Sequence, residues 1–575
     1  IFFRARMICS VWGLVLLALL VPAEGCTVLL AAKGATTDGS LLTSHSNDGD
    51  GITDGRLFRV PAMTHPPNSR RPVYPSPETY PRLVLSDGSR GTGNYAPTPG
   101  QSDTRPLGDI PQVNATHALF EATYGIMNEH GLSAGESTCS SVSWETFGYA
   151  KPKPPKALMS IDELTRIAME RCTTAREAVQ LMGDLAVKYG FYGPDSFEGV
   201  AESLALVDTQ EAFVFHVLND PTHTSAIWAA QRVPDDHVVV IANMFIIREI
   251  NVSDSANFLY SDNMFSIAKQ HKLWAEGTPF DFTRVYSDGE YAHKYYSGRR
   301  MWGAARLLAP SLGLRPEYGN LKTDAPYPFS FRPDRHVAPP DFFRVLRDWY
   351  GGTPYDMTQG PAAGPYGSPN RYAAGVGELQ VKGNWERPID LFRSTYTFVV
   401  QASAAAPAPL RAVLWFGPHA AHGTCYVPIP SGSLAVPEPY RAARQGTLDR
   451  GSAFWAFRYV ENIANLKFSY MIKGVQDSQT AWEARGRQAV QQWHTISDPE
   501  QLTAAVRGHA AHVLAAWWQL ADLLMVTYAD GYITSPHGGN DASQATGYPA
   551  WWLKDVGYPQ GPPPPAPGVA DGQSS

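Results

Sequence analysis

The chain opens with a long apolar run and then changes to shorter segments of alternating polarity. Residues 8–21 are apolar, follow two arginines, and lead to Gly25 with a second small residue two positions earlier. A basic start, a short apolar core and small residues before the cleavage point are typical of a secretion signal. The run of 14 residues is short of the roughly 20 that a membrane-spanning helix needs. The pattern therefore predicts a signal peptide at residues 7–25, with a retained anchor as the weaker alternative.

The first segment after this run has the polarity of a β-hairpin. Two strand-like stretches within residues 26–46 flank the turn-forming sequence GATTDG. A turn centred in that sequence pairs residue 26 with about residue 47 in an antiparallel ladder. The hairpin therefore predicts that His45 and Asp48 return to the neighbourhood of Cys26.

Further strands and one irregular region follow from the same kind of pattern. Residues 61–113 are rich in Pro, Gly, Ser and Arg and predict a long irregular surface excursion with function only at its edges. Strand patterns are expected at residues 118–138 with a turn at 129–131, at 203–218 and 237–250 on either side of a polar link over 219–236, and at 395–402, 411–416 and 425–429.

Helical spacing of apolar residues appears in three places. Ser160, with Glu163 three residues later, predicts a capped helix that continues to about residue 189. A second cap, Thr173 or Thr174, is expected to restart that helix. Shorter helices are predicted at residues 298–308 and 341–350, before a Gly/Pro-rich loop at 351–372.

The C-terminal part contains a long amphipathic helix at residues 498–529. Trp517 and Trp518 give it an apolar face, but Asp522 interrupts the stripe, which favours packing against a core over contact with a membrane. From residue 556 the chain is Pro-rich and is expected to be extended or disordered. These boundaries leave residues 26–555 as the folded domain and 556–575 as a tail.

Composition and charge narrow the class of protein. The chain has 575 residues, of which 44% are hydrophobic and 18% charged, with a formal net charge of −7. It is long enough for a large core, and a weak negative charge without basic clusters implies neither nucleic acid nor an anionic membrane as a partner. Removal of the signal leaves four cysteines, too few for a disulfide scaffold. Asn114 and Asn251 begin glycosylation sequons, as expected on a secretory route.

Cys26 becomes the first residue if the signal is cleaved after Gly25. Such a cysteine has both a thiol nucleophile and an α-amine with a reference pKa near 8, which can take the thiol proton and return it to the leaving amine. The chemistry also needs donors for the oxyanion and a carboxylate to orient the amine, and the hairpin places Asp48 for the second role. A disulfide bond or lipidation of Cys26 are the alternatives that the position leaves open.

The motifs resemble those of peptidase family C69, whose members are cysteine dipeptidases similar to the secernins. The resemblance begins at Cys26-Thr27-Val28-Leu29, Asp38-Gly39-Ser40 and Asn47-Asp48, and it continues to about residue 490 through GIMNEHG at 125–131, TAREA at 174–178, WAAQRVPDD at 228–236, Ala242-Asn243 and GTPYD at 352–356. It implies the four-layer αββα sandwich of the N-terminal nucleophile hydrolases, an α+β fold. It also implies exposure of the cysteine by autocatalysis or signal peptidase, and hydrolysis of dipeptides.

The same resemblance assigns roles to individual residues. Cys26 matches the family nucleophile, and Asp48 matches the acid that holds its amine. Asn243 resembles the oxyanion-binding or substrate-binding Asn of related hydrolases, and Arg300, or its neighbour Arg299, is expected to supply a cation near the site.

His45 is the one departure from this pattern. Bacterial members that resemble this chain have Arg three residues before the acid, where this chain has His45. A histidine keeps the capacity to donate a hydrogen bond, but it is only partly charged at neutral pH. The resemblance therefore does not fix the binding of an anionic substrate group by His45 or the pH optimum.

Metal and cofactor sites have weaker sequence support. The spacings His419-x-x-His422-x-x-Cys425 and His509-x-x-His512 are metal-like, but neither has an acidic ligand motif beside it. The acidic loop that begins at Asp48 lacks the Gly and terminal Glu of a calcium loop. The chain also lacks GxSxG, HExxH and GxxxxGK[ST] motifs. We therefore expect no metal and no cofactor.

The sequence favours a secreted or endomembrane cysteine-type dipeptidase that acts on small peptides through a thioester on Cys26. One alternative is an amidohydrolase that acts on non-peptide N-acyl bonds, because the same chemistry cleaves any amide that fits the site. Another is a catalytically silent secretory glycoprotein in which Cys26 forms a disulfide bond.

Overall fold

The computed structural model describes residues 25–49, 51–75, 77–193, 201–288, 294–317, 327–372, 386–535 and 542–561. The predicted signal peptide, except Gly25, and most of the predicted tail lie outside these ranges. The expectations for those two segments therefore stay predictions.

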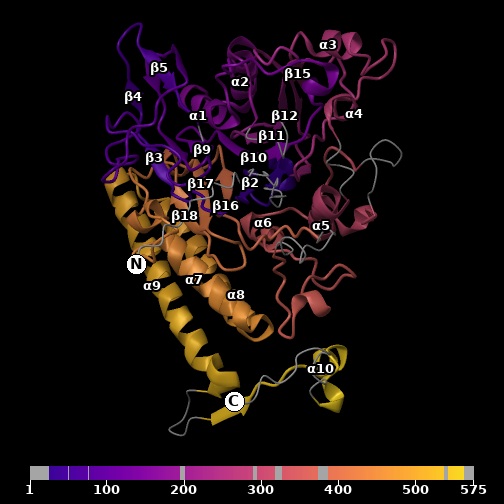
Figure 1. Cartoon of the computed structure of the whole chain (residues 1–575). Coiled ribbons are helices and arrows are strands. Elements are labelled where there is room, and N and C mark those ends of the chain that lie inside the picture. Colours follow the sequence, from indigo (N-terminus) through magenta and orange to yellow (C-terminus); the bar gives the residue numbers. More distant parts are fainter. Residues whose placement is uncertain are drawn as a thin grey trace, which may run out of the picture.

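Two large antiparallel sheets form the centre of the molecule (Figure 1). The six-stranded sheet has the order β14 (Val238–Ile241), β1 (Val28–Ala31), β2 (Leu41–Asn47), β16 (Tyr396–Ala402), β17 (Ala412–Pro418) and β18 (Val427–Pro430). The eight-stranded sheet has the order β15 (Phe258–Tyr260), β13 (Ala226–Arg232), β12 (Ala212–Asn219), β11 (Ala201–Val207), β10 (Ser133–Cys139), β9 (Gly125–Asn128), β8 (Leu119–Glu121) and β3 (Phe58–Val60).

Three two-stranded ladders lie outside these sheets. They pair β4 (Met63–Thr64) with β7 (Ala115–Thr116), β5 (Arg70–Val73) with β6 (Gly108–Pro111), and β19 (Tyr532–Ser535) with β20 (Ala542–Ala545). The α-helices of the described residues are α1 (Ile161–Arg171), α2 (Ala175–Tyr189), α3 (Met264–Gln270), α4 (Phe282–Tyr286), α5 (Arg299–Leu308), α6 (Pro339–Leu346), α7 (Ala453–Leu466), α8 (Phe468–Trp493), α9 (Pro499–Tyr528) and α10 (Ala550–Asp555).

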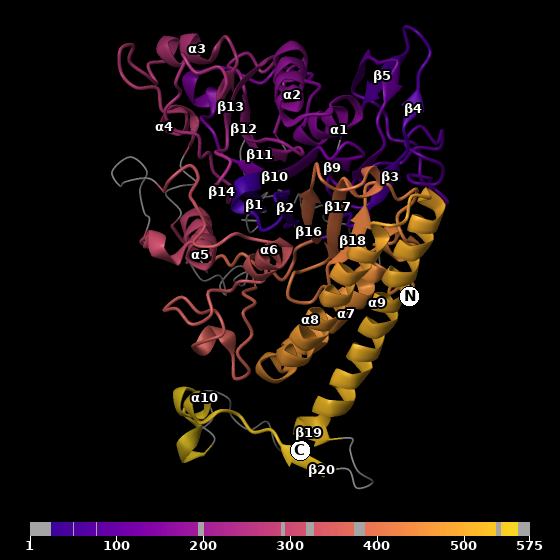
Figure 2. The same cartoon turned by 180° about the vertical axis from the view of Figure 1, so that it is seen from behind.

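Helices cover the outer sides of both sheets. β1 and β2 of the smaller sheet contact β10 and β11 of the larger one, and α1 and α2 pack against the larger sheet. Helices α7, α8 and α9 pack against β17 and β18 of the smaller sheet, so the strands lie between the two helical groups (Figures 1 and 2). Separate apolar clusters fill these layers because each sheet buries both of its faces. The predicted α+β class is confirmed.

The N-terminal hairpin has the predicted register. β1 and β2 pair with Leu30 opposite Thr43 and Ala31 opposite Leu42, and an isolated bridge joins Thr27 to Ser46. The same register sets residue 26 opposite residue 47. The prediction that the segment around His45 returns to Cys26 is therefore confirmed at the level of the backbone.

The first two helices begin at the predicted caps. The Ser160 hydroxyl accepts the backbone N–H of Glu163 at the start of α1, and Thr174 forms a full capping box with Glu177 at the start of α2. Glu163 does not complete a capping box at Ser160, because its carboxylate binds the buried arginines Arg71 and Arg166 instead. Burial among cations outweighs the local cap at that position.

Two predicted elements differ from the structure, and two helices lack a prediction. The polar link expected over 219–236 contains β13, a central strand whose Ala-rich sequence gives only a weak strand signal. The strand expected over 237–250 ends at Ile241, because the chain turns at Asn243, which has a left-handed φ of 54°. Helices α7 and α8 were not predicted.

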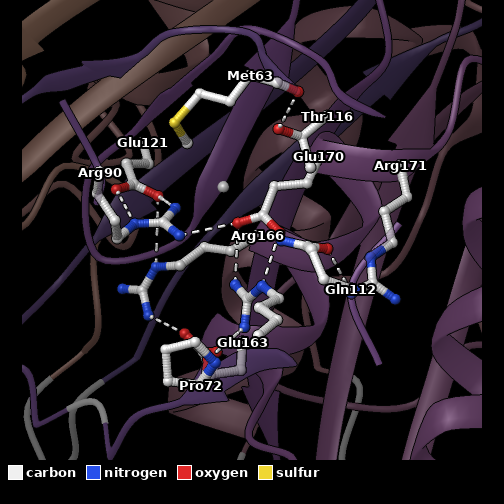
Figure 3. Close-up of polar contacts among 12 residues, drawn as sticks. Met63, Pro72, Arg90, Gln112, Thr116, Glu121, Glu163, Arg166, Glu170 and Arg171 are labelled. Carbon is white, nitrogen blue, oxygen red and sulfur yellow. Dashed lines mark hydrogen bonds and ion pairs between the residues drawn. The ribbon is translucent and has the colours of Figure 1, made fainter. Parts of the chain in front are cut away.

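Most of the described region at 61–113 is irregular and lies at the surface, as predicted, but its arginines Arg71, Arg82 and Arg90 reach the interior. Figure 3 shows Arg90 and Arg166 facing Glu121, with Glu170 on the other side of the cluster. Although burial opposes ionisation, Arg71 and Arg90 lower the pKa of Glu170 to about 2. Besides the short strands β4, β5 and β6, buried ion pairs to α1 thus anchor the excursion.

Helix α9 packs one face against the core, as predicted. Val506, Val513 and Trp517 are buried in the cluster formed with α7 and the smaller sheet. The indole of Trp517 donates to the carbonyl of Gly423 at 2.8 Å. By length and composition alone, residues 499–531 would also qualify as a membrane span, although one such helix with a core-packed face is weak support for a membrane role.

Candidate active site

Cys26 lies where the two sheets meet, just before β1. Its backbone carbonyl accepts hydrogen bonds from Arg300 at 2.8 Å and from the Ser137 hydroxyl at 3.3 Å. Its side chain is buried, and within the described ranges Cys26, Cys139, Cys172 and Cys425 form no disulfide bond. The backbone of Cys26 is therefore held from strand β10 on one side and from helix α5 on the other.

Asp48 lies directly after β2, and its carboxylate is fully engaged. Its Oδ2 accepts from Arg387 at 2.7 Å and from the Ser46 hydroxyl at 3.2 Å, while its Oδ1 accepts from the Ser394 hydroxyl. Ser46 also accepts the backbone N–H of Thr27 at 3.0 Å. The acid is thus joined through one serine to the residue that follows Cys26.

His45 and Glu136 form a buried pair beside the thiol. The Nδ1 of His45 lies 2.7 Å from the backbone carbonyl of Glu136, to which it donates. A ring nitrogen of His45, a carboxylate oxygen of Glu136 and the sulfur of Cys26 all lie within 4.8 Å of one another. Burial lowers the pKa of His45, so the imidazole is neutral.

The surroundings of the thiol disfavour the thiolate. Burial raises the pKa of Cys26 most, and the nearby carboxylates of Glu136, Asp48 and Glu78 raise it further. A hydrogen bond from the backbone N–H of Asp48 acts in the opposite direction. The thiol is therefore protonated as the site stands, and it needs a base that takes its proton during attack.

Asn243 and Arg300 meet at this site, as the resemblance suggested. Arg300 donates to the Asn243 side-chain carbonyl at 2.7 Å and to the Thr27 hydroxyl at 3.1 Å. The amide nitrogen of Asn243 donates to Thr138 at 2.7 Å, and its backbone N–H donates to Ser137 at 2.9 Å. Arg300 therefore positions the backbone of the nucleophile as well as the Asn243 amide.

Arg299, offered as the alternative to Arg300, lies in another environment. Its guanidinium binds Glu386 at 2.9 Å and stacks on Tyr355 at 3.4 Å from the ring centroid. Of the two neighbouring arginines, Arg300 is the one that contacts Cys26.

Gly25 occupies a tight position beside the nucleophile. A Cβ atom added to it would lie 2.0 Å from the Tyr296 hydroxyl and 2.6 Å from the Asn243 side-chain oxygen. The Gly25 carbonyl accepts from Arg387, the same guanidinium that binds Asp48. Cleavage after Gly25 would free space next to Tyr296 and leave the new α-amine of Cys26 close to that guanidinium and to Asp48.

Four residues of the site were missed in the sequence. Glu136 and Ser137 lie within the strand pattern at 118–138, where they read as ordinary polar positions. Arg387 and Ser394 lie in a stretch between elements, more than 300 residues from Asp48 along the chain. Only the fold brings them to Cys26, and no local spacing in the sequence indicates it.

A second buried network lies behind Asp48. The Nδ1 of His419 donates to the carbonyl of Ser394, and His419 also lies 3.9 Å from the carboxylate of Glu461. His422 is held between Asp390 at 3.0 Å and Glu461 at 3.2 Å. Although burial opposes protonation, the two carboxylates raise the pKa of His422 to about 10. The metal-like spacing of these histidines thus corresponds to a charged scaffold that supports the Asp48 loop.

Two groups of side chains have a geometry that a metal ion could use. One is the buried set Cys26, His45 and Glu136, and the other is the half-buried set His117, Glu129 and His130. In the second, His130 Nε2 and His117 Nδ1 are 3.1 Å apart. The glycosylation sequons at Asn114 and Asn251 are both exposed, which leaves that prediction open to test.

Comparisons with known proteins agree in naming one family. The model of peptidase family C69 matches residues 25–481. A probable dipeptidase of Latilactobacillus sakei is 24% identical over 436 residues, covering 76% of this chain and 80% of that protein. Dipeptidase A of Lactobacillus helveticus is 20% identical, covering 77% and 82%, and a dipeptidase of Bifidobacterium longum is 26% identical, covering 68% of each chain.

Because the family model spans most of the chain, the protein belongs to peptidase family C69. The resemblance drawn from the motifs is thereby confirmed, and the protein is a peptide hydrolase.

Proposed function

We propose that the protein is a cysteine-type dipeptidase that uses Cys26, exposed as the N-terminal residue, as its nucleophile. The observation that carries this proposal is that the guanidinium of Arg300 binds both the Cys26 carbonyl and the Asn243 side chain, while the Asp48 carboxylate lies close enough to act on the Cys26 thiol. The packing of two sheets between two helical groups supports an assignment to the N-terminal nucleophile hydrolases and their αββα sandwich.

The reaction begins after cleavage of the bond between Gly25 and Cys26. The Cys26 sulfur attacks the scissile carbonyl carbon while the new α-amine takes the thiol proton. The tetrahedral intermediate collapses, the carbon–nitrogen bond breaks, and the ammonium proton passes to the leaving amine. Water then attacks the thioester and gives a proton to the α-amine of Cys26. The carbon–sulfur bond breaks, that proton passes to the sulfur, and the first amino acid leaves.

Asp48 and Arg300 have positioning roles in this proposal. Asp48 orients the α-amine. Its serine and arginine partners hold its carboxylate in place for this role. Arg300 fixes the Cys26 carbonyl and the Asn243 amide, so that the Asn243 amide lies next to the developing oxyanion.

The same proposal includes the cellular compartment in which the enzyme acts. The signal pattern and the exposed sequons Asn114 and Asn251 support a secreted or endomembrane enzyme whose cysteine is exposed on that route. The enzyme would act on small peptides without a cofactor.

The test is turnover of a panel of unblocked dipeptides, tripeptides and N-acyl amides by the processed protein, by Cys26→Ala and by Cys172→Ala. Cys172 caps α1 and serves as a matched control, because it is a buried thiol outside the site. The proposal requires dipeptide turnover that Cys26→Ala abolishes and Cys172→Ala keeps. Turnover of N-acyl amides alone would favour an amidohydrolase, and turnover unaffected by Cys26→Ala would remove the nucleophile.

A further inference from the structure

Two buried acceptor atoms beside the nucleophile have no donor. The Oε2 of Glu136 and the Nε2 of His45 have no hydrogen-bond partner among the residues that the structure describes. Glu136 is 1% exposed and His45 is fully buried. A buried polar atom without a partner is costly, so such atoms in a site indicate a missing ligand group.

The missing group must be a donor. The Nδ1 of His45 donates to a carbonyl, which leaves the Nε2 of the neutral ring as an acceptor. The second oxygen of Glu136 already accepts from the Thr138 hydroxyl at 2.9 Å, which leaves Oε2 as an acceptor with negative charge. A cationic group with several N–H donors satisfies both atoms, and an anion or a carbonyl satisfies neither.

Glu136 is the acid in this region that remains open. Both carboxylate oxygens of Asp48 already accept hydrogen bonds, from Arg387, Ser46 and Ser394. Glu78 accepts from the Tyr124 hydroxyl at 2.9 Å and is only half-buried. A cation that approaches Cys26 therefore meets its free carboxylate oxygen at Glu136.

The distance between the Cys26 sulfur and the Glu136 carboxylate suits the amino terminus of a bound substrate. In an amino acid residue the α-nitrogen lies about 2.5 Å from the carbonyl carbon. A sulfur poised for attack lies about 3 Å from that carbon, and an ammonium group binds a carboxylate at about 2.8 Å. A carboxylate oxygen within 4.8 Å of the Cys26 sulfur is thus within reach of the ammonium group of the residue under attack.

We infer that Glu136, backed by the neutral ring of His45, binds the free α-ammonium group of the substrate and so restricts hydrolysis to the bond after the first residue. The inference rests on the proposed function, because it takes Cys26 as the nucleophile. In this role His45 acts as an acceptor for a cation, which differs from the anion-binding role that its position suggested from the sequence.

The experiment compares alanyl-alanine with propionyl-alanine, which has the same shape without the ammonium group. We expect the wild-type enzyme to prefer alanyl-alanine by about 100-fold in kcat/KM, the range of a buried charge-assisted hydrogen bond. Glu136→Gln should lose most of that preference, because alanyl-alanine loses the partner of its ammonium group and propionyl-alanine has no such group to lose. Glu136→Asp should restore part of the preference.

The matched control is Glu202→Gln. Glu202 is a buried acid on the neighbouring strand β11, near the same Thr138 hydroxyl, but it is not in the group around Cys26. This variant should keep the wild-type preference. An equal fall of kcat/KM for both substrates in Glu136→Gln, which leaves the preference unchanged, would overturn the inference. Absence of turnover of both substrates in the wild type would instead refute the proposed function.

Discussion

Removal of the Glu136 charge should make the Cys26 thiol more reactive toward a neutral reagent. After burial, the Glu136 carboxylate is the largest cause of the raised pKa of Cys26. Glu136→Gln keeps the size of the side chain and its bond from Thr138 while it removes the charge. The thiol pKa should fall, and the fraction of thiolate at neutral pH should rise.

The size of the expected change in reactivity follows from the distance between the Glu136 carboxylate and the Cys26 sulfur. A unit charge within 4.8 Å of the sulfur contributes about 3 kcal/mol at an effective dielectric constant of about 20. That energy corresponds to a rise in thiolate of about 100-fold, since 1.4 kcal/mol is tenfold. A less basic thiolate is also a weaker nucleophile, and this cancels about half of the logarithmic gain. The net expectation is an alkylation rate about tenfold higher.

The assay is alkylation by iodoacetamide at pH 7, followed by the mass of the peptide that contains Cys26. Iodoacetamide is neutral, so the acids of the site neither attract nor repel it. The other described cysteines are separated by their own peptides, and Glu202→Gln serves as the control that should match the wild type. A rate in folded Glu136→Gln that equals or falls below the wild-type rate would refute the electrostatic account of the site.

Three further predictions address the rest of the site. Asp48→Asn should lower turnover by at least about 1000-fold, which corresponds to about 4 kcal/mol and exceeds the roughly 3 kcal/mol of stability expected when the buried Arg387 loses its partner; kinetics and urea unfolding of the same sample check both, and equal turnover would remove Asp48 from the mechanism. The pKa of His422 is raised from 6.5 to about 10, so its contribution to stability, about 5 kcal/mol, is complete below pH 6.5 and is lost as the pH rises toward 10; urea unfolding of the wild type across that range should show a loss that His422→Gln lacks, and parallel curves would contradict it. Zn²⁺ should inhibit reversibly through the thiol, imidazole and carboxylate around Cys26, and a chelator should restore activity; full activity with bound zinc would show that these groups do not come together.

The parts of the fold that could be predicted are those fixed by local pattern. Two strand patterns and one turn set the register of the N-terminal hairpin, and that register brought Asp48 and His45 to Cys26. Hydroxyl caps marked the starts of α1 and α2 for the same reason, since a cap is decided by residues three or four apart.

The parts that could not be predicted depend on contacts between distant segments. Arg387 reaches Asp48 across more than 300 residues of sequence, and nothing near it distinguishes it from a solvated surface arginine. Glu136 looks like an outward-facing residue of a strand, and only the meeting of β10 with β2 buries it beside the thiol. Strand β13 was missed because its burial on both faces, rather than its alternation, stabilises it.

The central claim is that Cys26 acts as an N-terminal nucleophile. Its most direct test is the mass of the N-terminal peptide of the fraction that hydrolyses dipeptides, purified from a eukaryotic secretory host. The account predicts a peptide that begins at Cys26 with an unmodified amine and a free thiol. An active fraction that begins at another residue, has an acylated amine, or has Cys26 in a disulfide bond would contradict it, because the proposed base or nucleophile would then be missing.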